Sequence, residues 1–471
     1  MTNAIYWAII CYAYLTKAEH NNLTGEKMGK KLVIERGKET IGSNGGLAIV
    51  GAIIKRLKIG LRANSIKLKG GNPDISNSDI LVSYLGLLAM GRTNFEDIEL
   101  YRHDEIFRIT LGLNAVPSEG TMRQRLDAAG GAFDPLISEF NIALLASVTP
   151  TPVKTESGSY IPVDVDVSTF DNSGSHKSGV GRTYMGYDGY SPIFAYAGLE
   201  GFMVECELRP GTQHCQNGTP DFIAGLVSTL EEAWGRKVKY LSRFDSGNDA
   251  GENMVRLKGK MDFIIKRNLR KETLESWLDI AKNLGVAKTP RDGKTVWTGE
   301  TAMEVKDVGS VRVVFEVAER FTKFSKKAGA YERLLIPDIE VATFWTSLSD
   351  KPDAVIELYH QHGTSEQFHS ELKTDMDVER LPSGKFATNA TFLQLSMLAF
   401  NTLRMMGVEL LSYAADLPVR LDVGRRRIRS VMMDLVMAGC KLVKHANRLT
   451  LKTGKEYAWF DPFQRLYLKF C

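Results

Sequence analysis

Three acidic residues in this chain have the type and the placement that phosphodiester chemistry requires. Asp166 lies in the segment Val163-Asp-Val-Asp-Val167, Asp245 follows a second apolar segment, and Glu366 lies in Tyr359-His-Gln-His-Gly-Thr-Ser-Glu366. The first two segments read as buried strands, and the third has helical spacing. Carboxylate oxygens are the ligands that hard divalent cations prefer. We therefore expect Asp166, Asp245 and Glu366 to hold two metal ions at a phosphate ester.

Two of these carboxylates have a competitor close by in the sequence. Asp164 lies on the same strand face as Asp166, because strand residues alternate between faces. A buried aspartate is costly unless it is paired or metal-bound, so one of the two can be structural. Glu371 follows Glu366 by five residues, and on a helix the two would point in different directions. We favour Asp166 and Glu366 and keep Asp164 and Glu371 as alternatives.

The third segment places cationic and aromatic side chains next to its carboxylate. Offsets of 3, 7 and 14 residues put four side chains on one stripe of a continuous helix: Tyr359, His362, Glu366 and Lys373. Alternatively, Gly363 could interrupt the helix, with Thr364 as N-cap and Gln367 completing a capping box. Glu366 and Lys373 share a face in either arrangement. A plain amphipathic surface helix would have the same spacing.

The elements around these residues change character along the chain and predict an α/β fold with helical flanks. Period-2 segments begin after the Thr149-Pro-Thr-Pro152 linker, and helical spacing dominates before it. We expect the following divisions: a poorly ordered leader (1–45), a helical N-terminal domain (46–150), the first part of a catalytic core (151–269), a β-rich insertion (270–350), the Glu helix and the end of the core (351–411), and a basic helical C-terminal region (412–471).

Two regions outside the core could contact a nucleic acid. In the N-terminal domain, Ser118 or Thr121 can cap a helix that presents Arg123 and Arg125, which is compatible with a helix-turn-helix. A structural pair of helices fits the same residues. From residue 401 to the C-terminus, 13 Lys/Arg stand against 6 Asp/Glu, so this region could neutralise phosphates or form a solvated helix face.

The β-rich insertion contains two tryptophans of interest. We expect strands at Arg333–Ile336 and Glu340–Thr346, among others. Trp297 and Trp345 could stack on an unpaired base near a cleaved DNA end, although core packing accounts for them as well.

The amino-acid composition limits the class of protein less strictly than these motifs do. The 471 residues are 44% hydrophobic and 25% charged with a formal net charge of +4, which are ordinary globular values. Five scattered cysteines without a CxxC pair suggest neither a disulfide framework nor a zinc site. The apolar run Ala4–Leu15 is too short to span a bilayer, so we expect no membrane association.

With these motifs in place, the chain resembles the DDE transposases of bacterial insertion sequences, in the group with a Tyr-x2-Arg-x3-Glu-x6-Lys signature. The third motif matches in spacing throughout, and Asp166-Val-Ser-Thr169 and Arg243-Phe-Asp-Ser-Gly247 resemble the two Asp motifs. One position departs from the signature, because His362 stands where the family has Arg. Histidine is only partly charged at neutral pH, so a phosphate contact there would be weaker or pH-dependent.

The resemblance implies a ribonuclease-H-like catalytic core with the β-rich segment inserted before the Glu helix. It implies that Asp166 bridges two Mg²⁺ ions, for which Mn²⁺ would substitute, that Asp245 and Glu366 complete one site each, and that Tyr359, His362 and Lys373 position phosphates. The implied reactions are strand cleavage at the element's ends and transfer of the freed 3′-hydroxyl to target DNA.

The implied partners are double-stranded DNA, as terminal inverted repeats and target, and a second copy of the chain in the DNA complex. The implied location is the bacterial cytoplasm, at the nucleoid. Two alternatives stay open: a related two-metal nuclease without strand transfer, and a non-catalytic DNA-binding derivative.

Overall fold

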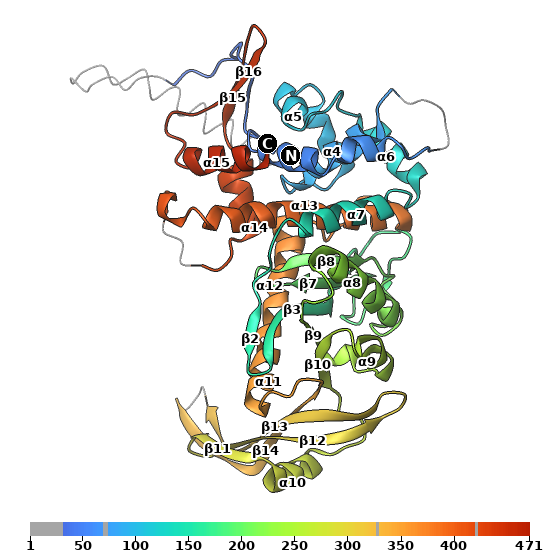
Figure 1. The fold of residues 1–471 in the computed structure, drawn as a ribbon, viewed down its shortest axis with the longest axis vertical. Helices are drawn as coiled ribbons and strands as arrows, with labels where there is room; N and C mark the ends of the chain where they lie inside the picture. The colour runs from blue at the N-terminus through green and yellow to red at the C-terminus, as the bar shows by residue number, and fades with distance from the viewer. Residues whose placement is uncertain (1–31, 69–73, 326–328, 420–422) are drawn as a thin grey trace, which may run out of the picture. The chain divides into compact units, whose positions relative to one another are not determined.

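A computed structural model describes residues 32–68, 74–325, 329–419 and 423–471 (Figure 1). Most of the expected leader, 1–31, lies outside the described residues. The chain divides into Met1–Glu39 and a compact unit, Thr40–Cys471. The described part of the first unit, 32–39, contains no helix or strand. None of the helices in the described ranges combines the length and apolarity needed to cross a membrane.

A mixed sheet forms the centre of the larger unit. Its strands are β3 (Gly158–Val167), β7 (Ile193–Ala197), β8 (Phe202–Glu207), β9 (Tyr240–Phe244) and β10 (Asp262–Arg267). They lie in the order β8-β7-β3-β9-β10. Of these five strands, β7 lies between β3 and β8 and is antiparallel to both. In contrast, β9 runs parallel to β3, and β10 runs parallel to β9. The carboxyl ends of β3 and β9 therefore meet at one edge.

The alternation of β3 explains both its burial and its acidic face. Val163 and Val165 are fully buried and belong to the main hydrophobic core. Asp164 and Asp166 point to the opposite face, as period-2 geometry requires. The expected strand at this position is therefore confirmed.

The β-rich segment extends the same sheet rather than forming a second one. Its strands are β11 (Val286–Arg291), β12 (Lys294–Val305), β13 (Gly309–Ser325) and β14 (Ala330–Thr346). They follow β10 in the order β14-β13-β12-β11, with β14 antiparallel to β10. The helix α10 (Leu274–Leu284), which Thr273 caps, packs on β12, β13 and β14. The two short strands expected at Arg333–Ile336 and Glu340–Thr346 are one continuous strand, so their separation was wrong.

Helices lie on both sides of the core strands. Figure 1 shows α8 (Thr219–Trp234) and α9 (Gly251–Leu257) on one side of the core strands, and α11 (Pro352–His360) with α12 (Ser365–Ser370) in line on the other. A 3-10 turn joins α11 to α12, and a π-helical turn, Glu371–Asp375, follows. Thr364 has helical backbone angles and its side chain makes no capping hydrogen bond. The capping-box interruption is therefore wrong, and the path is helical throughout.

The helical regions before and after the core pack together around α13 (Phe386–Leu411), which contacts α7 (Asp134–Leu145), α4 (Asn77–Leu88), α6 (Glu119–Ala129) and β8. Ser118 caps α6 by accepting a hydrogen bond from the Thr121 N–H, which is one of the two expected caps. The remaining helices in this part are α2 (Leu47–Arg56), α3 (Ile59–Ala63), α5 (Glu105–Thr110), α14 (Ile428–Val431) and α15 (Phe460–Phe470).

The C-terminal region also contains strands, which the expectation of a wholly helical region missed. The strands β15 (Cys440–His445) and β16 (Arg448–Thr453) form a hairpin, and β1 (Ile41–Gly42) pairs with β15. A further small sheet follows β3 and consists of β4 (Phe170–Asp171), β6 (Asp188–Tyr190) and β5 (Gly181–Arg182), while β2 (Val153–Thr155) pairs with the start of β3.

Candidate active site

Asp166 and Asp245 stand side by side at the carboxyl edge of the sheet. The parallel register pairs Val165 of β3 with Phe244 of β9; Asp166 is the next residue of β3, and Asp245 directly follows the end of β9. Burial raises the pKa of Asp245, and the negative charge of Asp166 raises it further. Asp166 is thus close enough to disfavour ionisation of Asp245.

Asp166 is held at both of its oxygens. Its own backbone neighbour, the Val167 N–H, donates to Oδ1 over 2.7 Å, and His369 Nε2 lies 3.4 Å from Oδ2. Burial alone would raise the pKa of Asp166, but His369 and His362 outweigh it and lower that pKa. The side chain keeps 25% of its surface exposed. Asp166 is therefore both ionised and reachable.

Asp245 begins a tight turn that fixes its carboxylate. Asn248 Nδ2 donates to Asp245 Oδ1 over 2.8 Å. A Cβ at Gly247 would lie 3.2 and 3.3 Å from the Asp245 oxygens and 3.1 Å from Cys215 Sγ. Those contacts are tighter than ordinary van der Waals distance, so glycine leaves room for the carboxylate at this position.

Asp164 has a different environment from Asp166. Arg243 of β9 forms a bidentate pair with it, with Nε 2.6 Å from Oδ1 and Nη2 2.8 Å from Oδ2. Both side chains are almost fully buried. The remaining guanidinium nitrogen, Nη1, donates to the Leu358 carbonyl of α11, which ties that helix to the strands. Its pairing leaves Asp164 a scaffold residue and favours Asp166 as the reactive carboxylate.

His362 and Tyr359 lie against this buried pair. His362 Nδ1 is 2.9 Å from Asp164 Oδ1, and the residue is only 7% exposed. Burial lowers the pKa of His362, but Asp164 and Asp166 raise it by more, so that its pKa lies above the usual value. Tyr359 packs on Phe344 at 4.7 Å between ring centroids, and burial followed by the nearby aspartates raises its pKa. Both residues thus face the carboxylates inside the protein.

Glu366 is exposed on α12 and faces a polar pocket of about 410 Å³. The pocket is lined by Gly363, Glu366, Gln367, Ser370, Glu371, Arg425 and Arg427. Across the described ranges, no three His, Cys, Asp or Glu side chains lie close enough together to hold a metal ion. The structure therefore brings together Asp166 and Asp245, and it leaves Glu366 separate from them.

Glu371, the competitor of Glu366, belongs to an arginine clamp. We use this name for Arg404, Arg425 and Arg427 bound to Glu371 and Asp375. Arg404 Nη2 lies 2.8 Å from Glu371 Oε2, Arg425 pairs with Oε1, and Arg427 grips Asp375 through two nitrogens at 2.7 and 2.9 Å. Glu371 is 2% exposed. Its charge is neutralised internally, which favours Glu366 as the carboxylate that is available for chemistry.

The other expected phosphate-binding residues all have partners within the protein. Lys373 Nζ lies 2.9 Å from Glu379 Oε1 and donates to the Thr169 carbonyl. Arg123 pairs with Glu119 of its own helix, and Arg125 donates to Asn77 Oδ1 over 2.8 Å. Their role in DNA binding stays a prediction.

Trp345 is a core residue rather than an exposed stacking platform. It is 5% exposed, and its Nε1 donates to the buried carboxylate of Asp249 over 2.9 Å. Trp297 is partly buried against the core, with the Lys282 ammonium 5.6 Å from its ring centre. For Trp345, the structure favours the packing alternative.

His369 is the site residue that the sequence reasoning missed. It follows Glu366 by three residues, so the same helical stripe includes it. Its contact with Asp166 brings α12 onto the edge of the sheet. Extending the stripe by that spacing would have identified it.

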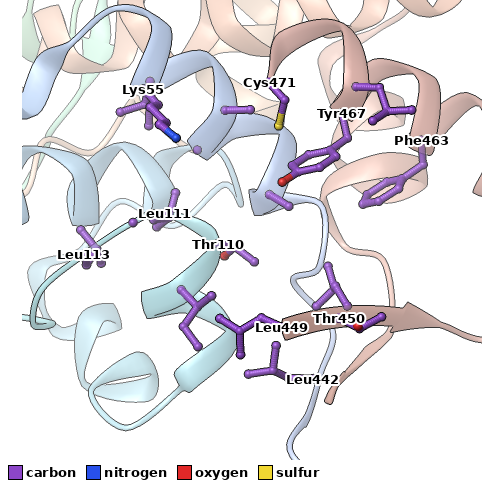
Figure 2. A pocket seen from close by; sticks show the side chains of 18 of the residues that line it. Lys55, Thr110, Leu111, Leu113, Leu442, Leu449, Thr450, Phe463, Tyr467 and Cys471 are labelled. Atoms are coloured by element: carbon purple, nitrogen blue, oxygen red, sulfur yellow. The ribbon is translucent and has the colours of Figure 1, made fainter. Parts of the chain in front are cut away.

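A second pocket, larger than the one beside Glu366, lies elsewhere and has a different chemistry. It measures about 1340 Å³ and is mostly apolar, between α2, α4, β16 and α15, and none of the three carboxylates lines it. Figure 2 shows Phe463 and Tyr467 on one side and Leu111 and Leu449 on another. We regard the strand edge, not this pocket, as the candidate active site, because ionisable groups with shifted pKa values meet there.

Comparison with known proteins agrees with the carboxylate motifs. The model of the family described as transposase DDE domain group 1 matches residues 25–470. Among solved structures, the chain is similar to the cryo-EM structure of the piggyBac transposase synaptic complex with hairpin DNA, with a TM-score of 0.42, 10% identity, and coverage of 85% of this chain and 83% of that chain. No curated protein matches the sequence. The family model spans nearly the whole chain, so the resemblance to DDE transposases is confirmed: the chain belongs to group 1 of the transposase DDE domain family.

Proposed function

We propose that this protein cleaves DNA strands at the ends of an insertion sequence and joins the freed ends to target DNA. The observation that carries the proposal is the pair of carboxylates, Asp166 and Asp245, at one edge of the sheet. Neither forms an ion pair with Lys or Arg within the described ranges. Two adjacent carboxylates without a Lys or Arg partner need protons, protonated histidines or metal ions to balance their charge.

We infer that the core is ribonuclease-H-like. The support is the strand order β8-β7-β3-β9-β10, in which three antiparallel strands are followed by two parallel ones. In this arrangement the first and fourth strands are neighbours, so the residues that follow them lie together. The β-rich segment enters between β10 and α11, in the position that the resemblance implies.

The residues present suit hard divalent cations. Asp166 is ionised and partly exposed, and Asp245 lies beside it, so both offer carboxylate oxygens, the ligands that Mg²⁺ and Mn²⁺ prefer. Glu366 would supply the third carboxylate from α12. Two bound Mg²⁺ ions, with Mn²⁺ as a substitute, would activate a water or 3′-hydroxyl and stabilise the leaving 3′-oxygen.

The protein's own side chains would then orient the DNA. Glu366 opens onto a polar pocket that also contains Arg425 and Arg427, and Lys373 lies further along the same helical path. We expect Lys373, Tyr359 and His362 to support the phosphates or the carboxylates that face them, and Arg123 and Arg125 to contact DNA. The proposed partners are terminal inverted repeats, target DNA and a second copy of the chain, and the proposed location is the bacterial cytoplasm at the nucleoid.

A cleavage and strand-transfer assay tests the function. DNA carrying the flanking repeats would be incubated with Mg²⁺ or a chelator and with wild type, Asp166→Asn, Asp245→Asn or Asp221→Asn. Asp221 is exposed and serves as the matched control. We expect both site variants to lose roughly 1000-fold in rate, because each removes a carboxylate that holds the ions, and the control to keep wild-type activity.

Other outcomes would select the alternatives. Cleavage without joined products from pre-cleaved ends would indicate a two-metal nuclease. Sequence-specific binding that persists in chelator, with no cleavage by the wild type, would indicate a non-catalytic DNA-binding derivative and would remove the metal assignment.

A further inference from the structure

The imidazole ring of His369 is fixed from several directions. Its ring centre lies 5.3 Å from those of Phe194 and Tyr196, with interplanar angles of 61° and 75°. Phe194 pairs with Asp166 across the β3–β7 ladder, and Tyr196 pairs with Asp164, so these side chains share one face of the sheet. The His369 side chain is 7% exposed. Packing therefore leaves the ring little freedom to rotate.

The hydrogen-bond partners of His369 indicate which of its ring nitrogens carries the proton. The Tyr196 hydroxyl lies 3.3 Å from His369 Nδ1, and no other partner for it is found in the described part of the chain. Burial raises the pKa of Tyr196 well above its usual value, so the phenol keeps its proton. A buried hydroxyl must donate that proton to an acceptor, and Nδ1 is the acceptor present. In the neutral imidazole, the hydrogen is then on Nε2.

That Nε2–H lies beside the candidate metal site. Nε2 is buried without a hydrogen bond of good geometry, and Asp166 Oδ2 is 3.4 Å away. A buried N–H without a partner is costly, and the carboxylate oxygen is the acceptor within reach. A protonated nitrogen has no lone pair to offer, so the same tautomer excludes His369 as a metal ligand.

We propose that His369 is a positioning residue that orients the Asp166 carboxylate for metal binding. Its Nε2–H directs Oδ2 while the Val167 N–H holds Oδ1, and each oxygen retains a lone pair for an ion. Without this support, the charge of Asp245 would push the Asp166 carboxylate away from the shared site. The helix α12 thus supplies both Glu366 and, one turn later, His369, which orients the Asp166 carboxylate. The inference rests on the proposed function of Asp166.

Mn²⁺ binding to the DNA-free protein, followed by the electron paramagnetic resonance signal of free Mn²⁺, tests the proposal without relying on activity. His369→Phe keeps an aromatic ring and removes both nitrogens. We expect its Mn²⁺ affinity to fall about 10- to 100-fold, which is the usual effect of losing a hydrogen bond to a metal ligand. His369→Gln, whose amide can reach the same oxygen, should recover most of the affinity, and His360→Phe, an exposed histidine of α11, should match the wild type.

Controls separate positioning from folding and from direct ligation. Thermal melting and DNA affinity in Ca²⁺ should stay at wild-type values in His369→Gln. If His369→Phe does not fold, the Mn²⁺ affinities of His369→Gln and Tyr196→Phe test the proposal instead. Tyr196→Phe frees the tautomer and should weaken Mn²⁺ binding by a smaller factor. Wild-type Mn²⁺ affinity in His369→Phe, or nitrogen-14 coupling to bound Mn²⁺ in the wild type, would overturn the proposal. Unchanged affinity in Asp166→Asn would instead overturn the proposed function itself.

Discussion

Carboxylates gather in two places, the arginine clamp on the helical path that carries Glu366 and the strand edge, and the two places differ in how charge is balanced. In the arginine clamp, Glu371 and Asp375 each meet at least one guanidinium within the protein. At the strand edge, Asp166 and Asp245 meet each other and two histidines, and neither pairs with Lys or Arg among the described residues. Each carboxylate of the arginine clamp is therefore paired with an arginine, whereas the two carboxylates at the strand edge are not.

The difference in pairing distinguishes carboxylates that stabilise the fold from carboxylates that are available to bind a ligand. A buried ion pair is costly to break, because the partner that remains is desolvated and unpaired. An unbalanced pair of carboxylates is costly to maintain and persists where it binds a ligand. Asp164 and Asp166 show the same contrast within one strand, since Arg243 neutralises only Asp164.

The largest expected effect comes from testing those two strand residues in parallel. Asp164→Asn would leave the Arg243 guanidinium, which is 2% exposed, without its anionic partner, and we expect a loss of about 3–5 kcal/mol of folding free energy. Asp166→Asn removes repulsion with Asp245 but also weakens the contact with His369, so we expect a much smaller loss of stability than in Asp164→Asn, while strand cleavage is lost. Urea unfolding followed by circular dichroism, together with the cleavage assay, measures both.

Equal destabilisation by the two substitutions would contradict the assignment of separate roles. Retained cleavage in Asp166→Asn together with an active-site defect in a well-folded Asp164→Asn would reverse the assignment.

The clamp should respond to removal of one arginine with a smaller loss. Arg404→Met keeps much of the side-chain volume but leaves Glu371 with Arg425 and the Ile428 N–H, and we expect about 3 kcal/mol of destabilisation. The double variant Arg404→Met/Glu371→Gln removes both charges and should recover part of that loss. Thermal melting measures both variants. A double variant that is less stable than the single one by the full cost of Glu371→Gln would show that the two residues do not interact.

The sequence predicted the strands of the core well, because valines alternate with aspartates in β3, and β9 is a short, wholly buried segment that ends at a polar turn. It failed at β14, where two strands were expected and one continuous strand contains Pro337. The register shifts from Arg320↔Asp338 to Thr322↔Arg333, so the residues between them form an irregularity opposite Phe321. A proline is tolerated there because the ladder hydrogen bonds are already interrupted.

The C-terminal hairpin lies in a region that was expected to be helical, so that expectation was wrong there. Leu442 and Leu451 alternate with lysines, which is a strand pattern, and Ala446 has a positive φ of 48° at the turn. A count of basic residues carries no information on periodicity.

For the site, sequence spacing identified the candidate carboxylates but could not rank them from physical causes. The residues that neutralise Asp164 and Glu371 lie 79 and 33 positions away, at Arg243 and Arg404. Only the fold brings such partners together. Local pattern could have identified His369, but not its contact with Asp166 on a distant strand.

The smallest expected effect concerns Glu205 of β8. The charge of this buried carboxylate is removed by a proton rather than by an arginine. Burial raises the pKa of Glu205 to about 7, although the Cys206 N–H and the Thr229 hydroxyl donate to it. The folded-state pKa exceeds the unfolded value near 4.5, so the folded state holds a proton that the unfolded chain has lost. The stabilisation is complete below about pH 4.5 and disappears as the pH rises through about 7.

Glu205→Gln removes this dependence, since an amide does not titrate. At pH 8 we expect the variant to be more stable than the wild type by about 2 kcal/mol, and at pH 4.5 we expect the difference to be near zero. Glu232→Gln, on the exposed side of α8, should show no such trend. Urea unfolding at several pH values measures it. If the wild type instead gained stability with rising pH relative to Glu205→Gln, Glu205 would be an ionised, paired carboxylate like those of the clamp, and a proton would not be the charge that balances it.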